Sequence, residues 1–301
     1  MGVKSFFIFL FVLLIIVLLL LYWFIPFGTT EFISKSINPI VGNSESGSQF
    51  YPNLRYKDSK ISYKIYDCTL QKKYDMERAF EILSEKTILS FYSIENNEEI
   101  SVSCEDKNQF KEGLFVAGEG GPSNITLAGK FSIILNGKIL LIRDSSCPNP
   151  NVALHELLHA LGFDHSSDRN NIMYNISNCE QTIGSDTINL INELYSVQNH
   201  PDLAFENVSA IMHGNYLDVN MSIRSIGFQT AEESRIIISV DEKVVKEVDL
   251  GILEVGFGKI VFLKNIWVID KNVERIEFFI FSDFEELDKD NNKVTLKILQ
   301  K

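Results

Sequence analysis

Residues 155–165 read His-Glu-Leu-Leu-His-Ala-Leu-Gly-Phe-Asp-His, and these side chains suit zinc chemistry. His155 and His159 are four residues apart, so a helix would place both imidazoles on one face, where they can bind the same ion. Gly162 permits the left-handed conformation that ends a helix, and the chain can then return with His165 as a third ligand. Three protein ligands leave one position open for water, which is the arrangement of a catalytic zinc site.

Glu156 lies between the two helical histidines and could act on a zinc-activated water. Zinc lowers the pKa of a bound water to about 7. We expect Glu156 to take the proton of this water as general base and to pass it to the leaving amine of a peptide bond. The alternative, histidines that pack in or cap an apolar helix, is disfavoured because three of the five histidines in the chain fall in this register.

The longer pattern H-E-x-x-H-x-x-G-x-x-H, followed by Asn-Ile-Met-Tyr over residues 171–174, resembles the metzincin clan of zinc peptidases. The serine after the third histidine and the Ile-Met-Tyr turn are most similar to the matrixin family, peptidase M10. The resemblance implies that Met173 packs beneath the imidazoles without binding the metal. It also implies that Tyr174 helps to form the pocket for the side chain after the scissile bond. Asn175 stands where matrixins usually have proline.

The elements around this motif follow the order of a matrixin catalytic domain. Alternating side chains predict strands, and helical spacing predicts helices after Asp75 and Ser185, on either side of the zinc helix. The glycine-rich residues 118–122 are predicted as a loop. We predict an α+β metzincin-like domain with a twisted mixed sheet and three helices over residues 53–199. No Pro-Arg-Cys-Gly-like cysteine switch precedes it, so we expect a site that is assembled without removal of a prosegment.

Two apolar runs, residues 130–135 and 138–143, flank Asn136-Gly137, and an Asn-Gly pair in this setting is a strong signal for a β-hairpin. By the resemblance, the strand Gly129–Leu135 would be the sheet edge beside the zinc, where an extended peptide can add as a further strand. An ordinary amphipathic strand without a binding role is the alternative. The candidates for substrate binding are Gly129, Phe131, Ile133 and Tyr174.

The four cysteines, Cys68, Cys104, Cys147 and Cys179, include no C-x-x-C pair, which gives a cysteine zinc site or a redox pair little support. Four cysteines allow three pairings, and their spacing does not choose among them. We favour Cys147–Cys179 because these residues bracket the zinc helix and the Met-turn, and this leaves Cys68–Cys104 to join two earlier elements. Free, buried cysteines are the alternative.

The N-terminal residues 6–27 carry no charge and form an apolar run that is long enough to span a bilayer as a helix. Lys4 precedes the run and Glu31 is the first charge after it, so the positive-inside rule predicts a cytoplasmic N-terminus and an extracellular remainder. We predict a transmembrane signal-anchor over residues 1–27 and a flexible linker over residues 28–52. The alternative is a cleaved signal peptide, which would export the domain equally well.

Beyond the catalytic domain, six or so strand-like runs over residues 200–301 predict an all-β, immunoglobulin-like sandwich. Its final residues, 285–298, resemble the CARDB-like adhesion modules of bacterial and archaeal surface proteins. An unrelated sandwich that stabilises the enzyme is the alternative. The acidic run Asp283–Asp290 could bind Ca²⁺, although a solvated turn is favoured.

The formal net charge of −12 argues against a nucleic-acid partner, since no cluster of lysine and arginine stands out against it. The sequence thus predicts a membrane-anchored, extracellular zinc endopeptidase with one catalytic Zn²⁺. Its partners would be a peptide or protein substrate and the lipid bilayer around residues 6–27, while its oligomeric state is left open. The rival interpretations are a surface adhesion or assembly protein that uses the metalloprotease fold as a scaffold, and a hydrolase of non-peptide bonds. The presence of Glu156 disfavours the scaffold, which has no use for a general base.

Overall fold

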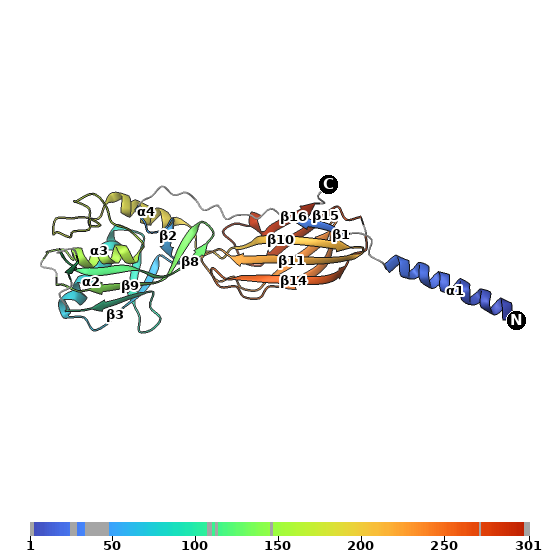
Figure 1. Cartoon of the computed structure of the whole chain (residues 1–301). Helices are drawn as coiled ribbons and strands as arrows, with labels where there is room; N and C mark the ends of the chain where they lie inside the picture. The colour runs from blue at the N-terminus through green and yellow to red at the C-terminus, as the bar shows by residue number, and fades with distance from the viewer. Residues whose placement is uncertain are drawn as a thin grey trace.

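The computed structural model describes residues 3–24, 29–33, 48–106, 110–111, 114–144, 147–270 and 272–297. They form a mixed α/β domain and a β-sandwich, with helix α1 (Val3–Phe24) at the N-terminal end (Figure 1). The sandwich lies between the α/β domain and α1, although most of its sequence follows the α/β domain (Figure 1). The order of the parts in space therefore differs from their order along the chain.

The α/β domain is built on a six-stranded mixed sheet. Five strands run in the order β2-β9-β5-β3-β4, and each neighbouring pair is parallel. The sixth strand, β8, pairs antiparallel with β9 along its length. The bounds are β2 (Leu54–Tyr56), β3 (Lys60–Ile65), β4 (Ser90–Ser93), β5 (Ile100–Cys104), β8 (Gly118–Ala128) and β9 (Phe131–Leu141); the short strands β6 (Phe110–Lys111) and β7 (Leu114–Phe115) form a separate pair.

Three helices share a hydrophobic core with this sheet: α2 (Leu70–Lys86), α3 (Asn151–Ala160) and α4 (Ser185–Ser196). Helix α2 packs against α3 and buries an apolar stripe at helical spacing, as an amphipathic helix does. Helix α3 is buried on nearly every side, because nine of its ten residues are buried. The mixed sheet and three helices agree with the α+β domain that the sequence predicts.

Strand β9 runs unbroken through Asn136 and Gly137, so the hairpin predicted at this pair is wrong. The turn lies earlier, at Gly129, which has a φ of +56°. A Cβ added to Gly137 would lie 2.2 Å from the hydroxyl oxygen of Tyr56. The glycine at position 137 therefore allows close packing inside the domain and does not form a turn.

The sandwich has two four-stranded antiparallel sheets around a separate core. Their strand orders are β1-β10-β11-β14 and β13-β12-β15-β16. Buried and exposed residues alternate along most of these strands, as expected when one face meets the core. The bounds are β1 (Thr29–Ile33), β10 (Leu203–His213), β11 (Tyr216–Ser225), β12 (Ser234–Val240), β13 (Lys243–Asp249), β14 (Gly258–Trp267), β15 (Arg275–Ser282) and β16 (Lys293–Lys297), with a 3₁₀ turn at Asp290–Asn292.

The prediction of a flexible linker over residues 28–52 is wrong at both of its described ends. Strand β1 pairs antiparallel with β10 over five residues and places Phe32 in the sandwich core. At the other end, Gln49 forms an isolated antiparallel bridge with Phe163 of the α/β domain. The sequence pattern missed both because each depends on a partner far away along the chain; residues 34–47 lie outside the described part.

Helix α1 covers most of the apolar run at the N-terminus, and residues 25–28 of that region lie outside the described part of the chain. A search of the described residues for helices that are long and apolar enough to cross a membrane identifies none.

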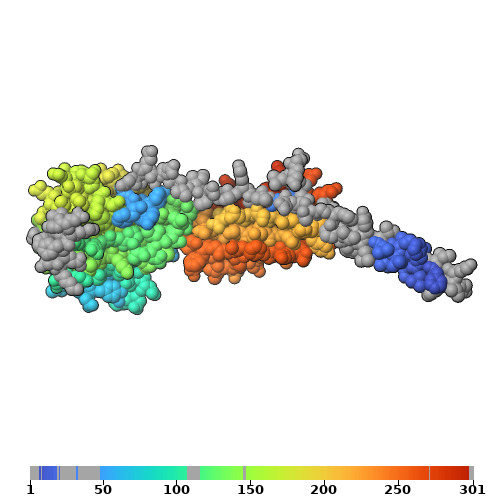
Figure 2. Space-filling view, viewed as in Figure 1, coloured from blue at the N-terminus to red at the C-terminus, as the bar shows by residue number. Residues whose placement is uncertain are grey.

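The two domains meet through loops of the sandwich that enter the core of the α/β domain. Phe228 and Val255 belong to that core, and the ring of Phe228 meets the ring of Phe131 edge-on at 4.9 Å. The guanidinium of Arg55 lies between the rings of Phe228 and Tyr195, at 4.4 Å and 4.5 Å from their centroids. Figure 2 accordingly shows the two domains in direct contact along one long axis.

Both disulfides that the sequence favours are confirmed. Cys68–Cys104 joins the residue before the N-cap of α2 to the end of β5. Cys147–Cys179 joins the segment before α3 to the segment after Met173. The second bond closes a loop that contains the whole predicted metal-binding motif.

Candidate metal centre

Helix α3 holds the first two histidines on one buried face. His155 and His159 are each 6% exposed, and their ring centroids are 4.5 Å apart. The helix ends where Gly162 adopts a φ of +95°, a conformation that favours glycine. A side chain is also excluded there, because an added Cβ would lie 2.4 Å from Leu54 Cδ2. The chain therefore turns at Gly162 and returns past the helix.

The returning chain brings the third histidine to the other two. The ring centroid of His165 lies 5.3 Å from that of His155 and 4.7 Å from that of His159. One ligand nitrogen from each histidine can be chosen so that all lie within 4.8 Å of one another. The three residues that the sequence predicts as metal ligands are thus placed together.

Backbone carbonyls orient the two helical imidazoles. His155 Nδ1 lies 2.6 Å from the carbonyl oxygen of Ile172, and His159 Nδ1 lies 2.7 Å from that of Phe163. A carbonyl oxygen only accepts hydrogen bonds, so each Nδ1 carries the proton and each Nε2 is free to bind a metal. Burial lowers the pKa of His155, and burial followed by the neighbouring His155 lowers the pKa of His159 to about 4. Both rings are neutral at pH 7, as metal ligands must be.

The positions of these nitrogens fit Zn²⁺. His159 Nε2 and His165 Nε2 are 3.2 Å apart. Two nitrogens bound at about 2.0–2.1 Å to a tetrahedral zinc ion lie about 3.3 Å apart. Neutral imidazoles with this separation are the donor set of a zinc site, whereas Ca²⁺ and Mg²⁺ prefer oxygen ligands.

Glu156 is held beside the centre on the same helix. It is 5% exposed, and burial raises the pKa of its carboxyl to about 8, with a further contribution from Glu119. Strand β8 passes directly over it: a Cβ on Gly118 would lie 2.7 Å from Glu156 Cγ, and a Cβ on Gly120 would lie 2.2 Å from Glu156 O. The carboxylate therefore lies in a narrow space between helix α3 and strand β8.

A comparison with known families finds one that resembles this domain. Residues 55–196 match the family model described as Matrixin. This part of the chain is therefore similar to the matrixin family, and we call the α/β domain that contains it the matrixin-like domain. A search among curated proteins finds no match to the chain.

The chain also has a similarity to a solved structure. The chain is similar to the CARDB domain of a Pyrococcus furiosus protein, solved in complex with di-metal ions. The identity is 14%, the TM-score is 0.28, and the match covers 33% of this chain and 87% of that one.

In the matrixin-like domain, the turn after the third histidine contacts the metal centre through its backbone. Met173 is 2% exposed and belongs to the domain core, and its N–H donates to Asn171 Oδ1 over 2.9 Å. The residue before it, Ile172, supplies the carbonyl that orients His155. Tyr174 follows at the surface of the same turn and is half-buried.

The edge strand of this sheet is β8, whereas the sequence favours the residues that begin β9. β9 has neighbours on both sides, and its residues Phe131 and Ile133 are buried in the core. Gly129 lies in the turn before it, where a Cβ would lie 3.5 Å from the backbone oxygen of Ile226 in the sandwich. The expectation that this strand forms the sheet edge is wrong, because β8 pairs along the whole of β9 and takes the edge position. A role of Gly129, Phe131 and Ile133 in substrate binding stays a prediction.

The glycines of β8 are the site residues that the sequence analysis missed. The glycine-rich pattern predicts a loop over residues 118–122, whereas these residues begin the strand. Gly118 and Gly120 are two apart, so they face the same side of the strand. A G-x-G pair ahead of an alternating segment was the available signal of a close approach to another backbone.

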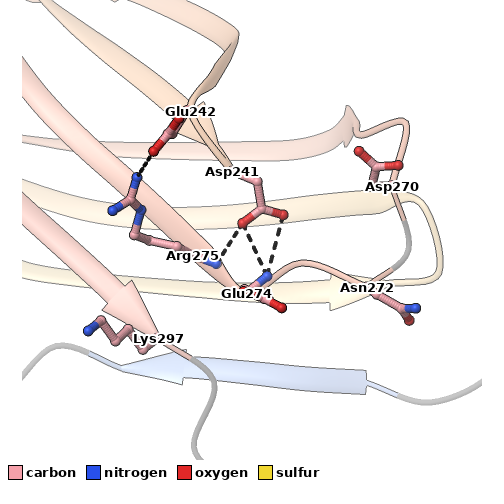
Figure 3. A pocket seen from close by; sticks show the side chains of 7 residues that line it. All are labelled: Asp241, Glu242, Asp270, Asn272, Glu274, Arg275 and Lys297. Carbon is pink, nitrogen blue, oxygen red and sulfur yellow. Dashed lines mark hydrogen bonds and ion pairs between the residues drawn. The ribbon is translucent and has the colours of Figure 1, made fainter.

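Two charged regions of the sandwich are separate from the metal centre. A cavity of about 780 Å³ contains Asp241, whose carboxylate accepts hydrogen bonds from the N–H groups of Glu274 and Arg275, while Glu242 pairs with Arg275 at 3.0 Å (Figure 3). In the acidic run that could bind Ca²⁺, the carboxylate of Glu286 accepts three hydrogen bonds from protein groups, the donors being Leu203 N, Ser282 Oγ and Asn292 Nδ2. The carboxylates of Asp241, Glu242 and Glu286 are thus bound by groups of the protein itself.

Proposed function

We propose that this chain is a membrane-anchored, extracellular zinc endopeptidase that cleaves peptide bonds with Glu156 as general base. One observation carries the proposal. Three histidines that could hold a single metal ion lie within reach of one another, and a buried carboxylate stands next to the first of them on the same helix. A structural zinc site would have no use for that carboxylate.

The residues of the site have distinct tasks in this proposal. His155, His159 and His165 would hold Zn²⁺, which when bound supplies a Lewis acid that acidifies water and polarises the scissile carbonyl. The Nδ1 bonds to backbone carbonyls keep the two helical rings in the required tautomer. The buried Glu156 carboxyl would ionise, because the positive charge of bound Zn²⁺ would lower its raised pKa. The carboxylate would then accept the proton of the attacking water and deliver it to the leaving nitrogen.

Strand β8 supports an extended peptide as the substrate. Among the described strands, it pairs only with β9, so its other edge can accept a further strand by backbone hydrogen bonds. The two glycines that bring β8 against Glu156 also bring this edge to the general base. A peptide added to β8 would therefore pass beside the metal, which favours peptide bonds over other hydrolysable groups.

The location of the enzyme follows from its N-terminal sequence. The uncharged run over residues 6–27 and the charges that flank it support a single-pass anchor with both folded domains outside the cell. Strand β1 joins the sandwich soon after α1, so an anchored chain would hold the sandwich next to the membrane and the matrixin-like domain beyond it (Figure 1).

The rival function is a non-proteolytic adhesion or assembly protein, and a single substitution separates the two. Glu156→Ala should retain zinc and lose the cleavage of an unfolded casein-like substrate, because only the general base is removed. Glu193→Ala is the matched control, since Glu193 is an exposed glutamate on α4 of the same domain. If wild type, Glu156→Ala and Glu193→Ala all leave the substrate equally intact, the scaffold interpretation replaces the proposal.

A further inference from the structure

We propose that residues 48–50, which precede the segment that matches the matrixins, position the metal centre of this chain. In this role Phe50 covers the ring of one ligand, and the backbone on either side of Gln49 holds the loop that carries another. The inference rests on the proposed zinc site and assigns a further set of positioning residues to it.

Phe50 lies against a metal ligand. Its ring stacks on the ring of His159 with centroids 5.7 Å apart and an interplanar angle of 21°. The Nδ1 atom of that imidazole is held by the carbonyl of Phe163. Two independent contacts therefore fix the plane of His159, one from the end of its own helix and one from the N-terminal segment.

The backbone of the same segment holds the loop of the third ligand. Phe50 N–H donates to the carbonyl of Gly162 over 3.0 Å, and Asp164 N–H donates to the carbonyl of Ser48 over 2.9 Å. On the far side of His165, Ser166 N–H donates to the carbonyl of Met173 over 2.8 Å. The residues before and after His165 are thus tied to two different segments, and His165 is held between them.

This support matters because His165 is the least buried of the three ligands. It lies on an exposed loop, whereas His155 and His159 are rigidly placed on a buried helix. Its ring contacts the rings of the other two histidines. Its position therefore depends on the backbone of residues 162–166, which residues 48–50 hold through two hydrogen bonds.

Gln49 locks the segment in place. Its side chain is 9% exposed and makes two hydrogen bonds with the backbone of Leu54, one from Nε2 to the carbonyl over 2.7 Å and one from the N–H to Oε1 over 3.2 Å. The segment is therefore a built part of the domain. It acts in the opposite sense to an inhibitory prosegment, because displacing it would weaken the metal centre.

The test is the zinc affinity of the full chain, measured by competition with a fluorescent chelator. Phe50→Ala is expected to weaken zinc binding about tenfold, as expected for a group that orients a ligand from outside the coordination shell. Phe50→Tyr keeps the stacked ring and should restore the affinity of wild type. Tyr51→Ala is the matched control, because Tyr51 is the next aromatic residue and is 55% exposed. The melting temperature with the metal removed should be the same for all four proteins, since Phe50 is itself 39% exposed.

The inference is overturned if Phe50→Ala binds zinc as tightly as wild type, or if Phe50→Tyr loses as much affinity as Phe50→Ala. If the metal-free Phe50→Ala protein does not fold, Phe50→Leu takes its place and must show weaker zinc binding at an unchanged metal-free melting temperature. If the wild-type chain binds no zinc, the proposed function itself is wrong. If the wild type binds zinc and the variants bind it equally well, only the role of residues 48–50 is wrong.

Discussion

Gly120 in strand β8 is the position at which the smallest change should most disturb the chemistry. A Cβ at this position would lie 2.2 Å from the carbonyl oxygen of Glu156 and 2.9 Å from both its carbonyl carbon and its Cα. All three atoms belong to the backbone of a buried helix, so no side chain can rotate to make room. The variant Gly120→Ala must therefore push β8 and α3 apart.

The size of the displacement follows from the contact distance. Cβ atoms essentially never approach another heavy atom closer than 3.0 Å, so at least 0.8 Å of separation is needed. Overpacking of this kind costs about 1–3 kcal/mol of the free energy of unfolding. A misplacement of about 1 Å between a substrate edge and a catalytic group can lower turnover about 100-fold.

Gly121→Ala is the matched control for this substitution. Nothing lies within 4 Å of a Cβ at position 121, although the residue is next to Gly120 on the same strand. Alanine there should leave turnover unchanged and raise the free energy of unfolding by about 0.4–1 kcal/mol, because it restricts the unfolded chain.

The assay is the cleavage of a quenched fluorescent peptide, with urea unfolding measured on the same preparations. Zinc content should be equal in Gly120→Ala, Gly121→Ala and wild type, so that a fall in turnover reports the position of β8. A Gly120→Ala protein that is as stable and as active as Gly121→Ala would refute the packing of β8 against Glu156.

Three further predictions concern stability. Phe228→Ala should lower the free energy of unfolding of the α/β domain by about 3–5 kcal/mol, because this sandwich residue fills the core of that domain. Urea unfolding, with the release of zinc as the signal, checks this, and an unchanged midpoint would contradict the shared core. Replacing Cys147 and Cys179 by serine opens a loop with a sequence separation of 32 and should cost about 3–4 kcal/mol in the same assay, whereas a loss well below that would show that the unfolded chain gains little freedom. Burial raises the pKa of Asp202 from 3.8 to about 7, so the folded state retains a proton that the unfolded state has lost, and the free energy of unfolding should fall as the pH rises through that interval. Asp202→Asn should flatten this dependence in melting curves recorded against pH, and equal slopes for the two proteins would contradict the assignment.

The metal ligands could be predicted from the sequence because local geometry determines them, whereas the disulfides were favoured from the order of the cysteines along the chain. His155 and His159 are one helical turn apart in any α-helix, and Gly162 marks the place where that helix must end. Cys147 and Cys179 bracket the motif along the chain, and they pair in the structure. The prediction of the metal ligands needs only a few residues and one regular helix.

The edge of the sheet could not be predicted in this way. Asn136-Gly137 carries a strong local signal for a turn, but long-range packing against Tyr56 keeps it inside β9. The real turn at Gly129 makes β8 the edge strand, and it places β8 against Glu156. Strand pairing is a choice among distant partners, and a short-range signal is overridden when another pairing buries more of the chain.

The sequence alone therefore determined which side chains could bind zinc and move a proton, since residue type and helical spacing decide that. Only the tertiary structure decided what surrounds them. It brought Gly118 and Gly120 onto Glu156 and Phe50 onto His159, and it added strand β1 to the sandwich. The physical reason is that the close approach of two backbones, or the stacking of two rings, depends on contacts between segments that are far apart along the chain. The sequence of one such segment does not indicate which other segment it will contact.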